Sequence, residues 1–274
     1  MKRLLALALL LCFLTGCGAE DRDRGPSSDC TPTQEPQAEE THLLLDGRRY
    51  TYDGDADDLT VENDRLILRR AGVYRLSGEL KEGRIRVETG AEATVRLILD
   101  GVSISSSFGS PLELCGAACV TLEMARGSVN FLSGGGVIGD GEALPAACIR
   151  SEGTLVLCGD GFLTVKGERS DGIAAMGRVI VSGGSATVAA ERNGVWTRDG
   201  LYLNAGSLTV STAECGVAAP SETTGKVMLS GGRLTANCTK VGILAGREIA
   251  VGSCEVSVLA PTRYQAPSPC EISG

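Results

Sequence analysis

Histidine, tryptophan and aromatic residues in general are scarce in this sequence. Its 274 residues include one His and one Trp, and aromatics make up 4% of the chain. A single histidine, His42, gives a zinc site little support. The motifs C-x2-C, H-E-x-x-H, G-x-S-x-G and the P-loop are missing, and no helical apolar periodicity appears past residue 20. These absences argue against a zinc enzyme, an α/β-hydrolase and a helical fold.

Glycine and aliphatic residues are abundant instead. The chain has 37 Gly, and hydrophobic residues reach 43%. This combination favours short strands joined by tight turns. The length fits one large or two small domains.

The first 17 residues have the pattern of an export signal. Lys2 and Arg3 precede an apolar stretch, residues 4–14, that is too short to span a bilayer as a stable helix. The stretch ends in Leu-Thr-Gly before Cys17, which resembles the bacterial lipoprotein signal. That resemblance implies cleavage after residue 16, a lipid on Cys17, and an extracytoplasmic protein anchored to the bacterial cell membrane or cell surface. The alternative is a plain secretory peptide.

Residues 17–42 are polar and contain proline without an apolar period, so we expect a flexible tether. Removal of residues 1–16 would leave 24 basic and 34 acidic residues, a net charge of −10. Such an acidic chain is a poor candidate for binding nucleic acid or anionic lipid headgroups.

Nine of the eleven cysteines remain when Cys12 of the signal and Cys17 are set aside. Disulfides are plausible outside the cytoplasm, and buried cysteine also packs as a small apolar residue. Spacing alone does not pair them.

An internal repeat near 22 residues dominates the second half of the chain. Four segments align with spacings of 22, 22 and 26, and the longest holds an insertion at 221–225. Each continues with two apolar strands separated by a small or Gly-Gly pair. The segments begin at Asp171-Gly172-Ile173, Asn193-Gly194-Val195, Cys215-Gly216-Val217 and Val241-Gly242-Ile243.

Three short strands per 22 residues describe one coil of a solenoid, which must stack on its neighbours to bury its apolar side. We therefore expect an all-β, right-handed parallel β-helix of about eight coils over residues 43–260. Residues 43–58 would cap its front, and a tail at 261–274 its back. Gly172 and Gly183-Gly184 would turn corners. Stacking would place one apolar residue of each coil in an interior ladder: Ile173, Val195, Val217 and Ile243.

Earlier coils fit with looser spacing. The first spans Val61 to Leu80, and later strands include the apolar pairs Leu112/Leu114 and Val129/Phe131.

Several ordered motifs resemble a family of bacterial surface proteins with carbohydrate-binding domains. Residues 71–114 resemble its opening, G-x-Y-x-L-S-G followed by V-x-L-x-L-x-G-V-x-I. Residues 127–135 resemble its G-x-x-N-x-L-x-D-G segment, with Gly134 where Asp is usual, and residues 151–173 resemble its run ending in D-G-I. The match covers about residues 60–260.

The resemblance implies a β-helix on a lipoprotein tether that binds plant-type or acidic, uronate-containing polysaccharides. It also implies calcium as a structural or bridging ion. The acidic residue of the D-G-I repeat is lost along this chain, because Asp171 is followed by Asn193, Cys215 and Val241. That loss weakens the calcium inference.

Catalysis is the alternative that the architecture raises, since β-helices also host pectin lyases and hydrolases. Such enzymes need clustered carboxylates with a nearby base. His42 lies beside the tether, and no repeat column stacks several Asp. We expect a protein that is not an enzyme.

Trp196 is the leading candidate for sugar binding. Strand alternation places it on the outer face between the small residues Ala174 and Ala218, where its ring can stack on a sugar. Arg150, two coils away, and Arg198 are candidates to bind a uronate carboxylate. The alternatives are that Trp196 packs under a loop or against a partner and that the arginines are solvated.

Oxygen-bearing side chains near the repeat turns are candidate calcium ligands. The alternative is that the glutamates pair with neighbouring charges or are solvated. The candidates are Asp171, Glu168, Glu191, Asn193 and Asp199.

The favoured interpretation is therefore a monomeric, lipid-anchored β-helix that binds polysaccharide without cleaving it and has no nucleic-acid partner. Two alternatives stay open: a structural or adhesive solenoid that contacts proteins or the cell wall, and a diverged polysaccharide lyase.

Overall fold

The computed structural model describes residues 39–136, 144–267 and 271–272. The chain divides into two units, residues 1–31 and 32–274, and every described residue belongs to the second. Cys17, the export signal and most of the expected tether lie outside the described residues. In the described part, no helix has the length and apolar character that crossing a membrane requires.

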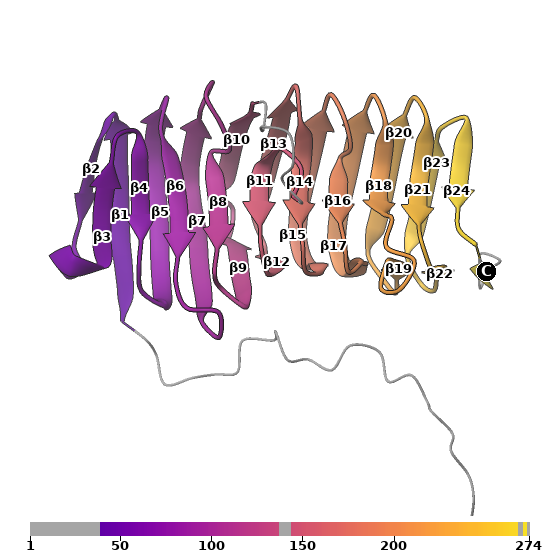
Figure 1. The fold of residues 1–274 in the computed structure, drawn as a ribbon, viewed down its shortest axis with the longest axis horizontal. Coiled ribbons are helices and arrows are strands. Elements are labelled where there is room, and N and C mark those ends of the chain that lie inside the picture. Colours follow the sequence, from indigo (N-terminus) through magenta and orange to yellow (C-terminus); the bar gives the residue numbers. More distant parts are fainter. Residues whose placement is uncertain (1–38, 137–143, 268–270, 273–274) are drawn as a thin grey trace, which may run out of the picture. The chain divides into compact units, whose positions relative to one another are not determined.

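The described residues form an all-β solenoid of about eight turns, as predicted (Figure 1). Its strands belong to two sheets, and one 3₁₀ turn spans Ala56–Asp58. The large sheet contains β1 (Glu40–Gly47), β2 (Arg49–Tyr52), β5 (Gly72–Lys81), β7 (Thr94–Ser105), β9 (Cys119–Met124), β10 (Val129–Gly135), β12 (Thr154–Gly159), β13 (Phe162–Glu168), β15 (Val179–Ala190), β17 (Leu201–Thr212), β19 (Lys226–Leu229), β20 (Arg233–Cys238), β22 (Glu248–Val251), β23 (Glu255–Leu259) and β25 (Glu271–Ile272). The small sheet contains β3 (Leu59–Glu62), β4 (Arg65–Leu68), β6 (Arg84–Glu88), β8 (Leu112–Cys115), β11 (Ala147–Ser151), β14 (Asp171–Ala175), β16 (Val195–Thr197), β18 (Cys215–Ala219), β21 (Val241–Ala245) and β24 (Thr262–Gln265).

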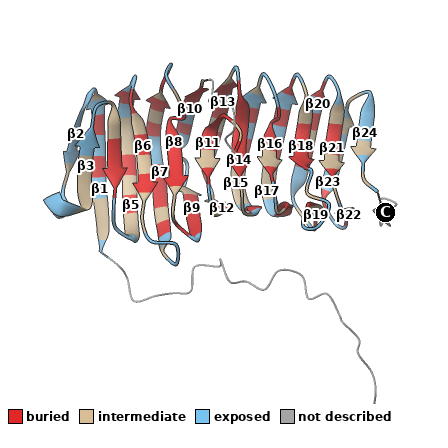
Figure 2. Ribbon diagram, viewed as in Figure 1, coloured by how far each residue is buried: buried red, intermediate tan, exposed pale blue. Residues whose placement is uncertain are grey.

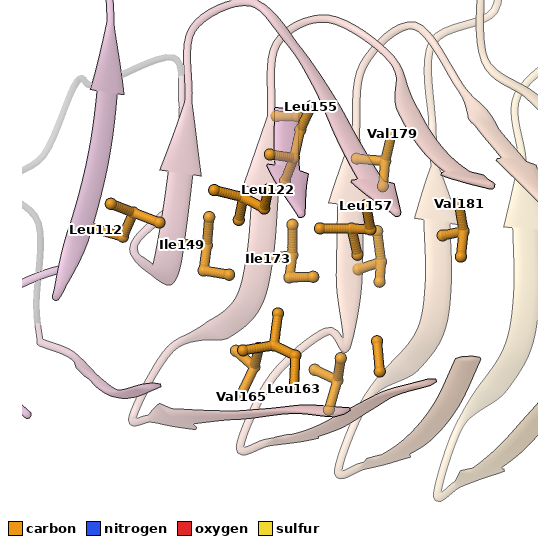
Figure 3. Packing of buried hydrophobic residues seen from close by; sticks show 14 of the residues in the cluster. Leu112, Leu122, Ile149, Leu155, Leu157, Leu163, Val165, Ile173, Val179 and Val181 are labelled. Carbon is orange, nitrogen blue, oxygen red and sulfur yellow. The ribbon is translucent and has the colours of Figure 1, made fainter. Parts of the chain in front are cut away.

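The strand register confirms the 22-residue repeat. Ile173 pairs with Val195, Val195 with Val217, and Val217 with Ile243, all in parallel. All four of these side chains are completely buried, as is Ile149 one rung earlier. Figure 3 shows Ile149 and Ile173 packed among the leucines and valines of the other strands. Burial of each such side chain stabilises the folded state by about 1.5–3 kcal/mol. Because every coil contributes one of them, the hydrophobic core runs along the stack.

The three expected strands of a coil are present, but two of them join in the middle of the stack. β15 and β17 are 12 residues long, and each bends through a register shift near Ser182. Gly184 and Gly206 sit at the bend with φ of +70° and +78°, a conformation that glycine adopts without strain. The large sheet therefore has two halves, and β10, β13, β20, β23 and the second parts of β7, β15 and β17 form its second half.

Gly172 has a different role from the predicted corner. It lies in β14 and does not have a left-handed φ. A Cβ there would lie 2.2 Å from Val188 Cγ1 and 2.7 Å from the carbonyl oxygen of Gly194. Equivalent close contacts occur at Gly194, Gly216 and Gly242. The repeat keeps glycine at this position because no side chain fits.

The apolar pair Val129/Phe131 was expected to line a coil, and this expectation is wrong. Both side chains face solvent, with exposed fractions of 70% and 37%, whereas Asn130 and Leu132 are completely buried. Asn130 Oδ1 accepts hydrogen bonds from the backbone N–H groups of Gly101 and Val102 at 3.0 Å. Its Nδ2 donates to Ser128 Oγ and to the Phe162 carbonyl. A fully hydrogen-bonded asparagine therefore takes the interior position.

The boundaries of the stack differ slightly from those expected. β1 begins at Glu40, inside the expected tether, and forms a parallel rung with β5. β2 pairs antiparallel with β1, and β3 pairs antiparallel with β4, so antiparallel strands close the front of both sheets. At the back, β24 and β25 extend the stack past residue 260.

Candidate functional site

The outer surface of the small sheet carries the candidate sugar-binding residues. The strands β11, β14, β16 and β18 lie side by side there (Figure 1). Their register places one outward residue of each strand in a column, as predicted. In chain order the column contains Arg86, Glu113, Arg150, Ala174, Trp196, Ala218, Leu244 and Gln265.

The character of this column changes along the stack. At the front, Arg86 Nη1 lies 3.3 Å from Glu113 Oε2, and Glu113 is buried by its arginine neighbours. Around Trp196 the column is apolar, with Ala174 and Ala218 on the adjacent rungs. The middle of the sheet therefore offers an aromatic ring between small neighbours, next to a basic group at Arg150.

Trp196 is half-buried rather than fully exposed. It packs with Met176 against a small cluster formed by Leu144, Ala147 and Ala174. Leu144 precedes β11, and its side chain shares this cluster with Ala174 and packs against part of the tryptophan. All five residues of β14, Ala174 among them, are buried (Figure 2). The rest of the side chain stays accessible to solvent, and the ring is held in place by its contacts.

The two arginines flank Trp196 in different ways. Arg150 Nη2 donates a hydrogen bond to the carbonyl of Leu144 at 3.2 Å, which holds the guanidinium near the tryptophan's cluster. Arg198 follows Trp196 by two residues at the end of β16, and its side chain is 53% exposed. Its Nε donates to Asp199 Oδ1 at 3.2 Å. The structure therefore places Arg150 in the same column as Trp196 and Arg198 just past the end of the strand that carries Trp196.

Asp171 and Asn193 form a polar ladder at the corner before the small sheet. Asp171 is completely buried, and its Oδ1 accepts from the backbone N and the Nδ2 of Asn193 at 2.9 and 3.1 Å. Asn193 Oδ1 in turn accepts from the backbone N of Cys215 at 3.4 Å. Asp171 Oδ2 has no hydrogen-bond partner, and burial raises the pKa of this carboxyl. The side chains at this column link successive coils.

The other candidate calcium ligands are distributed over two places. Gly167 pairs with Ala190, so Glu168 and Glu191 follow on neighbouring rungs near the Asp171 corner. Glu168 accepts from Lys166 Nζ and Ser133 Oγ, both at 3.0 Å, and these hydrogen bonds lower its pKa.

Asp199 lies past the opposite end of β16 and accepts from Thr224 Oγ1 at 3.0 Å. Within the described ranges, no three His, Cys, Asp or Glu side chains group closely enough to hold a metal ion. These five side chains do not form an oxygen cage for calcium in this arrangement.

His42 lies in β1, at the front of the stack. Its Nε2 is 3.5 Å from Glu40 Oε1, and the side chain is 56% exposed. It is therefore many rungs from Trp196, as its position in the sequence suggested.

A second group of exposed apolar side chains was not predicted. Phe162, in β13, is 53% exposed and pairs with Val129 on the neighbouring rung. Phe131 lies beside them, and Phe108, at 78% exposed, lies in the loop after β7. The one sequence signal for this group was that the stretch V-N-F-L can form a strand with either Val and Phe or Asn and Leu facing the core.

Comparison with known proteins agrees with the fold and the resemblance. Residues 62–269 match the family model described as "Carbohydrate-binding domain-containing protein". A protein with that name from Acetivibrio thermocellus is 30% identical over 199 residues, which cover 69% of this chain and 65% of the relative. The match thus spans slightly less than two thirds of that relative. A solved structure described as the polysaccharide lyase-like protein from C. thermocellum, in a gadolinium derivative, superposes with a TM-score of 0.81. It is 25% identical, and the match covers 85% of this chain and 97% of that one.

Proposed function

This chain belongs to the family of carbohydrate-binding domain-containing proteins, and we propose that it binds acidic, uronate-containing polysaccharide without cleaving it, through the outer surface of the small sheet. The observation that carries the proposal is the grouping of Trp196, Arg150 and Arg198 on that surface. A partly packed tryptophan offers a rigid apolar plane for a sugar ring. The guanidinium groups offer paired donors for a carboxylate.

The geometry supports a ligand that runs along the stack. Arg150 and Trp196 are two rungs apart, about 10 Å at the usual strand spacing. Ala218, on the rung after Trp196, is small and leaves space for a ring beside the indole, whereas Ala174 on the other side is covered by Leu144. Because the chain has a net negative charge, an anionic glycan needs positively charged side chains at its binding site, and the two arginines provide them.

Binding without cleavage is supported by the state of the carboxylates near this surface. Asp171 is buried away from solvent. The carboxylate of Asp199 accepts hydrogen bonds from Arg198 and Thr224. Neither is placed as one of a pair of solvent-facing acid and base groups. The lyase-like relative makes the opposite outcome worth measuring, and release of unsaturated products from pectate would overturn this part of the proposal.

The proposed setting is the outer surface of a bacterial cell, with a lipid on Cys17 and a monomeric solenoid. Replacement of Cys17 with Ala should move the protein from the membrane fraction to the soluble exported fraction. Recovery of the variant in the membrane fraction would contradict the anchor.

Affinity electrophoresis in gels containing polygalacturonate tests the binding surface. The wild-type protein should be retarded, and Trp196→Ala should lose about tenfold in affinity, the loss of one ring contact of about 1.4 kcal/mol. Arg198→Gln should weaken retardation by polygalacturonate more than by its methyl ester. Phe108→Ala, which removes an exposed ring from the loop between β7 and β8 and leaves the Trp196 column unchanged, is the matched control. Gels with added calcium or a chelator test whether binding depends on the calcium that the family resemblance implies. No retardation of the wild type by any glycan would favour the structural solenoid.

A further inference from the structure

The second half of the large sheet presents a regular column of hydroxyl groups. Thr164, Thr187, Thr209, Thr235 and Ser257 pair in register across β13, β15, β17, β20 and β23. We refer to these five residues as the threonine column. Neighbouring rungs of a sheet are about 4.8 Å apart, so the column extends about 19 Å along the stack.

The column faces solvent because its sequence neighbours face the core. Leu208 and Val210, on either side of Thr209 in the sequence, are 1% exposed. Ala186 and Val188, which flank Thr187, are buried in the same way. Thr187, Thr209 and Ser257 are exposed, and Thr164 and Thr235 are partly exposed.

Charge is confined to the margins of this surface. Lys166 pairs with Glu168 at 3.0 Å, and Arg233 pairs with Glu255 at 2.7 Å. Between them, Ser207 Oγ donates to Ser185 Oγ at 2.9 Å. The threonine column itself is therefore uncharged in a chain of which 22% is charged. The neighbouring column of Ser185 and Ser207 continues at the back into the ion pair of Arg233 and Glu255.

Exposed aromatic rings continue the column toward the front of the stack. Phe131 pairs with Thr164, so it occupies the next rung of the same column. Phe162 lies in the adjacent column, paired with Val129 on one side and Ser185 on the other. Large apolar side chains that stay exposed beside a flat polar surface are typical of a recognition site.

We propose that the threonine column, together with Phe131 and Phe162, is a second glycan-binding surface whose ligand is an uncharged, extended, β-linked polysaccharide lying along the stack. The proposal rests on carbohydrate binding by this protein and assigns a different surface and a different ligand class from those of Trp196. An uncharged glycan suits a surface without net charge. The rung spacing of about 4.8 Å is close to the advance per sugar of an extended β-linked chain, so hydroxyls can meet successive sugars in register. The phenyl rings would stack on the apolar faces of sugars at one end.

Hydroxyethyl cellulose, an uncharged β-linked glucan, and polygalacturonate are the two probes, used in separate affinity gels. Phe162→Ala removes a ring that the core does not use, and Thr209→Arg places a long side chain in the middle of the column. Both variants should lower affinity for hydroxyethyl cellulose at least about tenfold and leave polygalacturonate binding unchanged. Trp196→Ala should show the opposite pattern, and Phe108→Ala should change neither.

Each result decides one of the two proposals. If wild type does not bind hydroxyethyl cellulose, or if Phe162→Ala binds it as tightly as wild type does, the second surface is refuted while polygalacturonate binding can still hold. Loss of both ligands in Trp196→Ala would also refute it, because one surface would then serve both. Far-UV circular dichroism and thermal melting verify that each variant is folded, and Phe162→Ala keeps the test valid if Thr209→Arg does not fold.

Discussion

Replacement of Gly172 with alanine is the sharpest test of how closely the coils stack. The new Cβ would lie 2.2 Å from Val188 Cγ1, and Val188 is a β-branched, completely buried side chain with little freedom to rotate. It would also lie 2.7 Å from the Gly194 carbonyl oxygen, which accepts the Ile173 N–H at 2.9 Å. Relief of both contacts requires the two coils to separate.

Overpacking of this kind costs about 2 kcal/mol. For a protein of this size, that loss lowers Tm by about 4–8 °C. Thermal melting followed by far-UV circular dichroism measures the change. A Tm within about 1 °C of wild type would refute the argument that glycine is kept at this position for space.

Two matched variants separate space from backbone strain. Gly90 has nothing within 4 Å of its would-be Cβ and no left-handed φ, so Gly90→Ala should be neutral or stabilising by up to about 1 kcal/mol. Gly101 also has open space, but its φ is +73°, so Gly101→Ala should lose about 1–2 kcal/mol through strain alone. Equal losses in Gly90→Ala and Gly172→Ala would contradict the interpretation.

Three further predictions concern buried polar groups and thiols. Burial raises the pKa of Asp171 above its ordinary value of 3.8, so the stability that this group contributes is present at low pH and is lost as pH rises through the raised pKa. Asp171→Asn should therefore be more stable than wild type at pH 7, with the difference in urea unfolding midpoints shrinking toward about pH 4; an unchanged difference would contradict this. Asn130→Leu leaves the N–H groups of Gly101 and Val102 without their acceptor and should cost about 2–4 kcal/mol in unfolding free energy, whereas a cost below about 1 kcal/mol would show that water replaces the amide. Burial raises the pKa of Cys115 to about 11 and raises that of the completely buried Cys148 further, so native alkylation followed by mass spectrometry should find Cys148 unmodified and Cys115 slow; rapid labelling of Cys148 would show that the stack opens.

Much of the solenoid was predictable because the repeat is exact where the core is most regular. The segment that begins at Asp171 recurs twice at a spacing of 22 residues, and its register places Ile173, Val195 and Val217 in one ladder. Periodicity identifies which positions repeat, but it does not say why. The expected turn at Gly172 is instead a place where a neighbouring coil leaves no room for Cβ.

The wrong assignment in β10 occurred because a polar residue takes an interior position. In β10 the sequence V-N-F-L supports either phase of alternation, and hydrophobicity favours Phe131 inside. The structure buries Asn130 instead, because four hydrogen bonds compensate its amide. That phase also produces the exposed rings beside the threonine column, so the second surface could not be found from the sequence pattern.

The candidate site was partly predictable for a related reason. The column containing Arg150 and Trp196 follows from strand register, which the repeat specifies. The cover over Trp196 comes from Leu144, in an irregular segment before β11 that has no periodic signal. The contacts of Asp199 likewise depend on Thr224 in the insertion of one coil.

The affinity of Trp196→Ala for polygalacturonate, measured beside Phe108→Ala, tests the central claim most directly. The proposed surface requires a loss of about tenfold at Trp196 and no loss at Phe108, with both variants folded at the assay temperature. Equal affinity of wild type and Trp196→Ala would contradict glycan binding at the small sheet.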